Sequence, residues 1–222
     1  MVNKYYIFLF VFLSACGGGS SSEAPVIESP VWIASGQSNM AMMLDGHLAG
    51  PGEMPALPGY FIDYMHQSGQ SVTVIPTAIG ATSLECWQMG GPCFETKIRP
   101  LKGKVLAGVL WWQGEAEAEA CDGTADTYGT RLQHLIESWR VFFNSPGLPF
   151  YVVQLGTLPT SADIDPAVEC GQGPGFWLNK WNAVKSGQAT VAHVTTSDIT
   201  YGDTIHPIYA YSEIARRVVS QL

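Results

Sequence analysis

The sequence predicts one α/β domain, a three-layer sandwich built on a parallel sheet of five strands. Five β-rich runs follow one another along the chain, at residues 31–35, 72–79, 105–112, 150–155 and 190–196. These runs are continuously apolar, which is typical of strands covered on both faces, as in a parallel sheet. Apolar stripes at helical spacing lie between and after them, which indicates helices that pack on the sheet.

Three segments carry the helical pattern most clearly, namely residues 127–143, 177–184 and 208–222. In the first, Leu132, Leu135 and Trp139 fall on one face because they recur every three or four residues. The last segment follows Pro207, a residue favoured at helix starts. Two Pro- and Gly-rich stretches, 45–59 and 159–175, lack this pattern, and we expect them to form ordered loops near the rim of the sheet.

The composition bounds the class of protein. The chain has 222 residues, of which 46% are hydrophobic and 14% charged, so it suits one domain with a sizeable core and excludes a disordered chain. Eleven basic residues stand against nineteen acidic ones, and no Lys/Arg cluster is present. We therefore expect no nucleic-acid partner, since such partners need a basic surface.

The N-terminal segment has the features of an export signal. Residues 1–15 contain Lys4 and an apolar run at 5–13 that is too short to span a bilayer. The run ends in the sequence LSAC at 13–16, which resembles a bacterial lipobox, and the alternative is an ordinary secretory signal with a chance cysteine. We expect a lipid on Cys16, a flexible tether at 16–29, and a single globular domain at 30–222. The expected location is the bacterial cell envelope, where the lipid would anchor the protein to the outer membrane with the domain facing the periplasm or the surface.

Four further cysteines suggest disulfide bonds, since an even number is typical of exported proteins. Three pairings are possible among them, and the sequence leaves the choice open. These residues are Cys86, Cys93, Cys121 and Cys170. No Cys-x-x-Cys or His-x-x-x-His spacing supports a zinc site, so we expect no metal.

Polar residues follow most of the predicted strands, at the point where each strand ends. Ser38 comes after the first, Gly80 after the second and Gln113 after the third, while Asp203 and His206 follow the fifth. Ligand sites in open parallel sheets lie beyond the carboxyl ends of the strands, so these residues should meet at one rim. Together they supply the groups needed for acyl transfer: a nucleophile, a base, a carboxylate that orients the base, and oxyanion donors.

Each of these residues has an expected role. Ser38 would be the nucleophile, and His206 would take its proton because the imidazole pKa lies near neutral pH. Asp203, three residues before His206, would bind the other ring nitrogen and hold the tautomer. The backbone N–H groups of Ser38 and Gly80, with the side-chain amide of Gln113, would form the oxyanion hole.

Three segments together resemble the SGNH (GDSL-like) hydrolase superfamily: GQSNM at 36–40, WWQGE at 111–115 and DTIHP at 203–207. Within it, the chain looks most like the carbohydrate esterases grouped with sialate O-acetylesterases and plant-type (family 6-like) acetyl xylan esterases. The resemblance runs from about residue 31 to the C-terminus. It implies a flavodoxin-like sheet and a Ser-His-Asp triad working through an acyl-enzyme. It also implies an acetylated carbohydrate as substrate and no cofactor.

The chain departs from the family pattern at two positions. Ala81 follows Gly80 where the family often has a second glycine, and Glu117 stands where an aspartate is expected. Gln113 stands where the broader superfamily has asparagine. None of these changes affects the predicted triad.

Several residues near the motifs allow two interpretations. Ser38 would also suit a helix N-cap, and Gln113 could serve only to bind a loop. Gln37, Asn39 and Glu115 are expected either to touch substrate or to anchor loops. The acidic run at 115–119 is expected to be a solvated helix start rather than a metal site.

The tryptophans also allow alternatives. Trp87 would either stack on a sugar ring or belong to the core beside Cys86. Trp111 and Trp112 are neighbours on a strand, so they should point to opposite faces and pack in the core. The fold alone leaves two other functions open: an esterase, lipase or thioesterase acting on a non-carbohydrate ester, and a catalytically silent glycan-binding lipoprotein.

Overall fold

Five parallel strands form one sheet, in the order β2-β1-β3-β4-β5. The computed structural model describes residues 29–41, 57–120, 122–158, 175–191, 193–201 and 205–222. The strands are β1 (Val31–Gly36), β2 (Thr73–Pro76), β3 (Gly108–Trp112), β4 (Phe150–Val153) and β5 (His193–Val194). This is the flavodoxin-like order, and it confirms the predicted α/β class.

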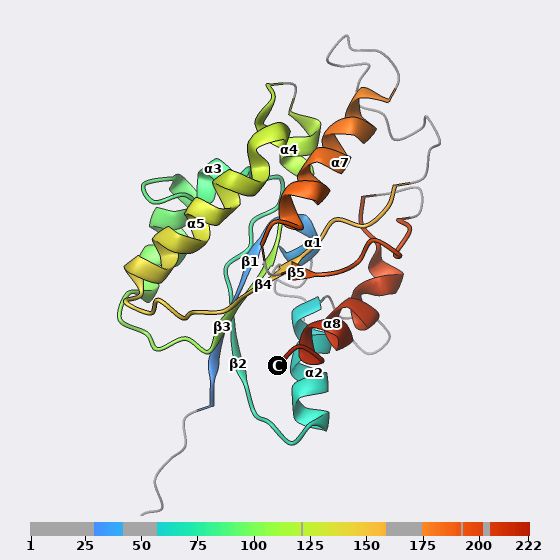
Figure 1. Ribbon diagram of the computed structural model, residues 1–222. Helices are drawn as coiled ribbons and strands as arrows, with labels where there is room; N and C mark the ends of the chain where they lie inside the picture. The colour runs from blue at the N-terminus through green and yellow to red at the C-terminus, as the bar shows by residue number, and fades with distance from the viewer. Residues whose placement is uncertain (1–28, 42–56, 121, 159–174, 192, 202–204) are drawn as a thin grey trace, which may run out of the picture.

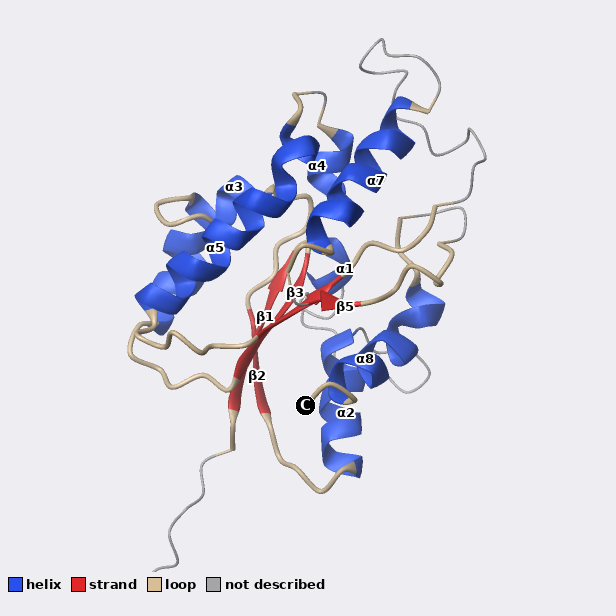
Figure 2. Ribbon diagram, in the orientation of Figure 1, coloured by secondary structure: helices blue, strands red, loops and turns tan. Residues whose placement is uncertain are grey.

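Helices cover both faces of the sheet (Figures 1 and 2). α2 and α8 pack together on one face, and α3 and α5 lie on the other, with α4 and α7 next to α5 at the rim. Their bounds are α1 (Ser38–Ala41), α2 (Leu57–Gln67), α3 (Leu84–Trp87), α4 (Glu115–Glu119), α5 (Tyr128–Phe142), α7 (Phe176–Gln188) and α8 (Tyr211–Val219). Short π- and 3-10 turns at Phe94–Ile98, Arg99–Leu101, Thr124–Thr127 and Ile208–Ala210 complete the described helices.

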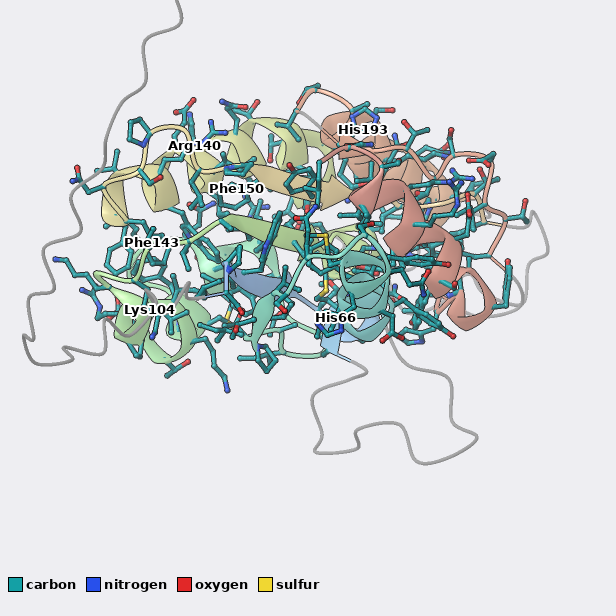
Figure 3. All side chains as sticks on the ribbon, turned by 90° about the horizontal axis from the view of Figure 1, so that it is seen from below. His66, Lys104, Arg140, Phe143, Phe150 and His193 are labelled. Carbon is teal, nitrogen blue, oxygen red and sulfur yellow. A yellow bond between two sulfur atoms is a disulfide. The ribbon has the colours of Figure 1, made fainter. Side chains whose placement is uncertain are left out.

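The central strand β3 carries an aromatic core on each face. Trp111 packs edge-on against Trp139 of α5, with ring centroids 5.9 Å apart, whereas Trp112 packs against Tyr211 of α8 at 5.5 Å. Both tryptophans are fully buried. The prediction that they face opposite layers is confirmed. Phe150 of β4, labelled in Figure 3, extends the cluster around Trp139.

The two edge strands are shorter than the β-rich runs that predicted them. The run at 72–79 yields only Thr73–Pro76, and the run at 190–196 yields only His193–Val194. An edge strand has a partner on one side only. The register of β2 with β1 ends at Pro76, although the backbone N–H groups of Thr77 and Ile79 still donate to the Ala34 and Gly36 carbonyls.

The sequence interpretation missed α2. The expected loop at 45–59 overlaps the first three residues of this helix, Leu57–Gln67. Pro58 and Gly59 favoured a loop, but Pro58 lies in the first helical turn, where the missing N–H costs no hydrogen bond. The rest of that stretch, and 159–174 of the second predicted loop, lie outside the described residues.

A disulfide joins Cys86 and Cys93, which confirms the short-range bond that was one of the predicted options. Cys121 and Cys170 lie outside the described residues, as do the predicted leader, Cys16 and most of the tether. In the part of the chain that is described, no helix is both long enough and apolar enough to cross a bilayer.

Candidate active site

The end of β1 turns Ser38 toward His206. The turn passes through Gly36, whose φ of +130° lies in a region that side chains disfavour. A Cβ there would also sit 1.9 Å from the carbonyl oxygen of Trp112, so only glycine fits. Two residues on, Ser38 begins α1, and its Oγ lies 2.8 Å from Nε2 of His206. The structure therefore brings the predicted nucleophile and base into hydrogen-bond contact across 168 residues of sequence.

The surroundings of His206 favour its neutral form. Partial burial lowers the pKa of its imidazole below the ordinary 6.5, because desolvation disfavours the charged ring. A neutral ring can accept the proton of the serine hydroxyl. Asp203, the predicted partner of His206, lies outside the described residues, so its role stays a prediction.

The loop after β2 brings Gly80 beside Ser38. A Cβ built on Gly80 would lie 4.0 Å from Cβ of Ser38, so the two residues are close neighbours. Ala81 has a φ of +56°, in the left-handed region where glycine is favoured. This backbone conformation explains physically why a second glycine suits the position. The oxyanion role of the Gly80 and Ser38 N–H groups stays a prediction.

Gln113 does not face the site. Its side chain is fully buried, and its Nε2 donates to Oε1 of Gln37 at 3.2 Å, to the Thr82 carbonyl at 3.1 Å and to the carboxylate of Glu117. Its Oε1 accepts from the hydroxyl of Tyr128 at 2.9 Å. An amide has two N–H hydrogens, and these internal acceptors occupy them. The expected oxyanion role of Gln113 is therefore corrected to that of a loop-binding residue.

Gln37 and Asn39, which flank the nucleophile, are both buried. Oε1 of Gln37 accepts from Gln113 and from the backbone N–H of Ala116, each at 3.2 Å. Asn39 donates through Nδ2 to Glu115 and to the Ile205 carbonyl, the latter at 3.0 Å. These contacts favour the loop-anchoring alternative over contact with substrate.

The acidic run at 115–119 is less solvated than predicted. Glu115 and Glu117 are buried, and only Glu119 of the three is exposed. Burial raises the pKa of Glu115 to about 7 against the opposing effect of its bond with Asn39, and it raises the pKa of Glu117 as well. The prediction of a solvated helix start was wrong for two of the three glutamates of α4 (Glu115–Glu119), because Glu115 turns inward to Asn39, and Glu117 to Leu84 and Gln113.

Trp87 belongs to the core. Its ring is fully buried, its Nε1 donates to Oγ1 of Thr82 at 3.0 Å, and it packs edge-on against Trp111 at 6.0 Å. No ring face is open to a sugar, so the core alternative is favoured.

The sequence did not indicate that two tyrosine hydroxyl groups would form hydrogen bonds with residues of the site. Tyr128 donates to the carbonyl of Gln113 at 2.7 Å, and Tyr211 donates to Oδ1 of Asn39 at 2.9 Å. The sequence places Tyr211 only in an apolar stripe, because a helical pattern shows the buried face but not where a hydroxyl finds its partner. Among the described residues, no group of three or more His, Cys, Asp or Glu side chains is arranged to hold a metal ion.

A flavodoxin-like sheet with a Ser–His pair beyond its strand ends is the arrangement of the SGNH hydrolase class. The chain matches a family model described as "Carbohydrate esterase, sialic acid-specific acetylesterase" over residues 57–216. This match covers most of the chain, and the protein belongs to that family. The matched region begins after Ser38, so the predicted role of Ser38 as nucleophile depends on its motif and on the geometry above.

The chain is similar to known proteins in sequence and in fold. The chain is 25% identical over 133 residues to a protein named "Probable carbohydrate esterase" from Arabidopsis thaliana, covering 58% of this chain and 50% of that one. A carbohydrate acetylesterase from Xanthomonas citri superposes with a TM-score of 0.62 at 21% identity, covering 85% of this chain and 55% of the other. A candidate SGNH hydrolase from Slackia heliotrinireducens gives 0.50 at 15% identity, covering 87% and 98%. The chain thus spans about half the length of the first two proteins.

Proposed function

We propose that this protein is a serine esterase that removes O-acetyl groups from a carbohydrate. The observation that carries the proposal is the 2.8 Å contact between Ser38 Oγ and His206 Nε2 at the rim of an SGNH-type sheet. Family membership supports ester hydrolysis, and the names of the family and its relatives support an acetylated sugar as substrate.

In the first half of the proposed reaction, Ser38 Oγ attacks the acetyl carbonyl carbon while its proton passes to His206 Nε2. The carbonyl oxygen becomes an oxyanion, which the backbone N–H groups of Ser38 and Gly80 stabilise. The bond to the sugar oxygen then breaks, and the sugar leaves with the proton from His206. Acetyl-Ser38 remains.

In the second half, His206 takes a proton from a water molecule as its oxygen attacks acetyl-Ser38. The second tetrahedral intermediate collapses, the bond to Ser38 Oγ breaks as that oxygen takes the proton back from His206, and acetic acid leaves. Asp203, assigned from its motif alone, would accept a hydrogen bond from the other ring nitrogen throughout. Atoms balance as one ester and one water giving one alcohol and one acetic acid, and no cofactor enters.

The test is acetate release by the full chain from acetylated xylan, from O-acetylated sialic acid and from a series of p-nitrophenyl esters. Wild type and Ser38→Ala are compared, with thermal unfolding to show that both fold. We expect turnover of one glycan by wild type and none above background by Ser38→Ala. An undiminished rate in Ser38→Ala would rule out the nucleophile.

The pH dependence tests the base. A protonated imidazole cannot accept a proton, so kcat/KM should fall as the pH drops through the pKa of His206, which burial holds below 6.5. A flat profile from pH 5 to 8 would contradict His206 as base. Turnover of aryl esters alone would favour a non-carbohydrate ester, and no turnover would favour a silent glycan-binding protein.

We also propose, from the sequence motif, that Cys16 carries a lipid that holds the protein at a membrane of the cell envelope. Expression in a bacterial host with a radiolabelled fatty acid should label wild type but not Cys16→Ser. Equal labelling of both, or of neither, would overturn the anchor.

A further inference from the structure

Two buried carboxylates of α4 reach different segments of the chain. Glu115 and Glu117 are 0% and 1% exposed, and they lie two positions apart. Residues two apart on a helix do not share a face, so the two side chains diverge. The reaction proposed above assigns a step to neither.

Glu115 is connected to the nucleophile and the base through one side chain. Its Oε1 accepts from Nδ2 of Asn39, the same Nδ2 donates to the carbonyl of Ile205 at 3.0 Å, and Oδ1 of Asn39 accepts from Tyr211 of α8. Asn39 is covalently next to Ser38, and Ile205 is next to His206. One amide therefore ties both flanks of the Ser–His pair to α4.

Glu117 is connected to the loop that carries Gly80. Its Oε1 accepts from the backbone N–H of Leu84, and its Oε2 accepts from Nε2 of Gln113. That amide in turn donates to the carbonyl of Thr82 at 3.1 Å. Thr82 and Leu84 follow Gly80 within four residues, so this second carboxylate holds the backbone of the expected oxyanion loop.

We propose that α4 positions the two halves of the active site separately, with Glu115 setting Ser38 against His206 and Glu117 setting the Gly80 loop. The kinetic part of this proposal rests on the proposed esterase function, whereas its geometric part does not. Both glutamates are positioning residues, since neither contacts the reacting atoms. Their effect is large because a misplacement of about 1 Å can cost about 100-fold in rate.

The same isosteric substitution should act differently at the two positions. Glu115 uses only Oε1 as an acceptor, because its Oε2 is buried without a hydrogen-bond partner among the described residues. Glutamine keeps one acceptor oxygen, so Glu115→Gln should retain most of the rate and Glu115→Ala should not. Glu117 uses both oxygens, so Glu117→Gln must lose one of its two bonds.

The experiment measures two properties of the full-length protein. The first is the rate at which an organophosphonate labels Ser38, which needs an activated serine but not the natural substrate. The second is the titration of the His206 ring followed by NMR. Glu137→Gln, on the exposed surface of α5, is the matched control for removing one negative charge.

We expect Glu115→Ala to slow labelling by about tenfold or more and to shift the His206 titration, while Glu115→Gln restores both. We expect Glu117→Gln to slow labelling by about tenfold or more and to leave the His206 titration in place. Glu137→Gln should match wild type in both. Where Glu115→Ala does not fold, Asn39→Ala breaks the same connection from the other end.

Three outcomes would overturn the proposal. One is a wild-type labelling rate in Glu115→Ala, and another is equal loss in the two Gln variants. The third is a parallel fall of rate and melting temperature in every variant, which would indicate a structural role only. If wild type neither labels at Ser38 nor cleaves any ester, the proposed function fails. The positioning proposal is then decided by the His206 titrations alone.

Discussion

The two sides of the rim are held by different kinds of interaction. The base side, which we define as residues 36–41 and 205–211, is joined by polar side-chain bonds that converge on Asn39. The loop side, residues 80–93, is held by the Cys86–Cys93 disulfide and by Trp87 packed on Trp111. The base side should therefore respond to protonation and polar substitution. The loop side, which Glu117 and Gln113 also bind through Leu84 and Thr82, should respond to reduction and changes in packing as well as to polar substitution.

The largest expected effect is on the base side, at Gly36. Gly36→Ala would place a Cβ 1.9 Å from a carbonyl oxygen in a backbone region that L-residues avoid, so it should lower the free energy of unfolding by about 3 kcal/mol or more. Urea unfolding measures this loss. Gly147→Ala is the control, because nothing lies within 4 Å of that position. Equal effects at both glycines would contradict the close approach of β1 and β3.

Next comes the dependence of stability on the ionisation of Glu115. Its pKa is about 7 in the folded protein against an ordinary value of 4.5 for an exposed glutamate, so the folded state binds the proton more tightly. The contribution of this tighter proton binding to the free energy of unfolding is fully present below pH 4.5, and it is lost as the pH rises through about 7. The loss should be about 3 kcal/mol at most, relative to Glu115→Gln, which does not titrate. Melting temperatures of both proteins between pH 4 and 8 test this, and a constant difference would contradict it.

On the loop side, removal of the disulfide should cost about 2.5 kcal/mol, the entropy of closing so short a loop. The double variant Cys86→Ser with Cys93→Ser is compared with wild type by urea unfolding. We expect the His206 titration to stay in place, because the disulfide lies on the other side of the rim. A shifted titration would show that the two sides are coupled.

The smallest expected effect is at Ala81. Its φ of +56° costs an L-residue about 1–2 kcal/mol, and glycine would remove this strain. Glycine also has greater conformational freedom in the unfolded chain, which offsets part of that gain. Ala81→Gly should therefore stabilise the protein by up to about 1 kcal/mol. Ala183→Gly, in the middle of α7, should instead destabilise by about 1 kcal/mol. A loss at both positions would contradict the strained turn.

Much of the fold was predictable because apolar runs report burial. Each of the five runs overlaps one strand of the sheet, and the stripe around Trp139 became α5. The approach of Ser38 to His206 was also predictable, since both follow strands of one parallel sheet and such ends share a rim. The lengths of the two edge strands were not predictable, because they depend on how many residues pair with the neighbouring strand.

Buried polar residues were the main failure of the sequence interpretation. Gln113 lies after a strand end, where an oxyanion donor is expected, but Glu117 and Thr82 capture its amide. A linear pattern gives the position of a polar group along the chain and not its partner. The burial of Glu115 was missed for the same reason, because its partner Asn39 lies 76 residues earlier in the chain.

The direction of β1 separates the end where the chain enters the sheet from the end that carries the Ser–His pair. The chain enters the sheet at Val31 and reaches Ser38 only after the full length of that strand, about 20 Å at the usual rise per residue. Val31 and the Ser–His pair are thus at opposite ends of β1. If the proposed lipid anchor holds, the predicted tether joins the domain at the end of β1 that lies away from the Ser–His pair, which leaves the pair's end open to large polymers.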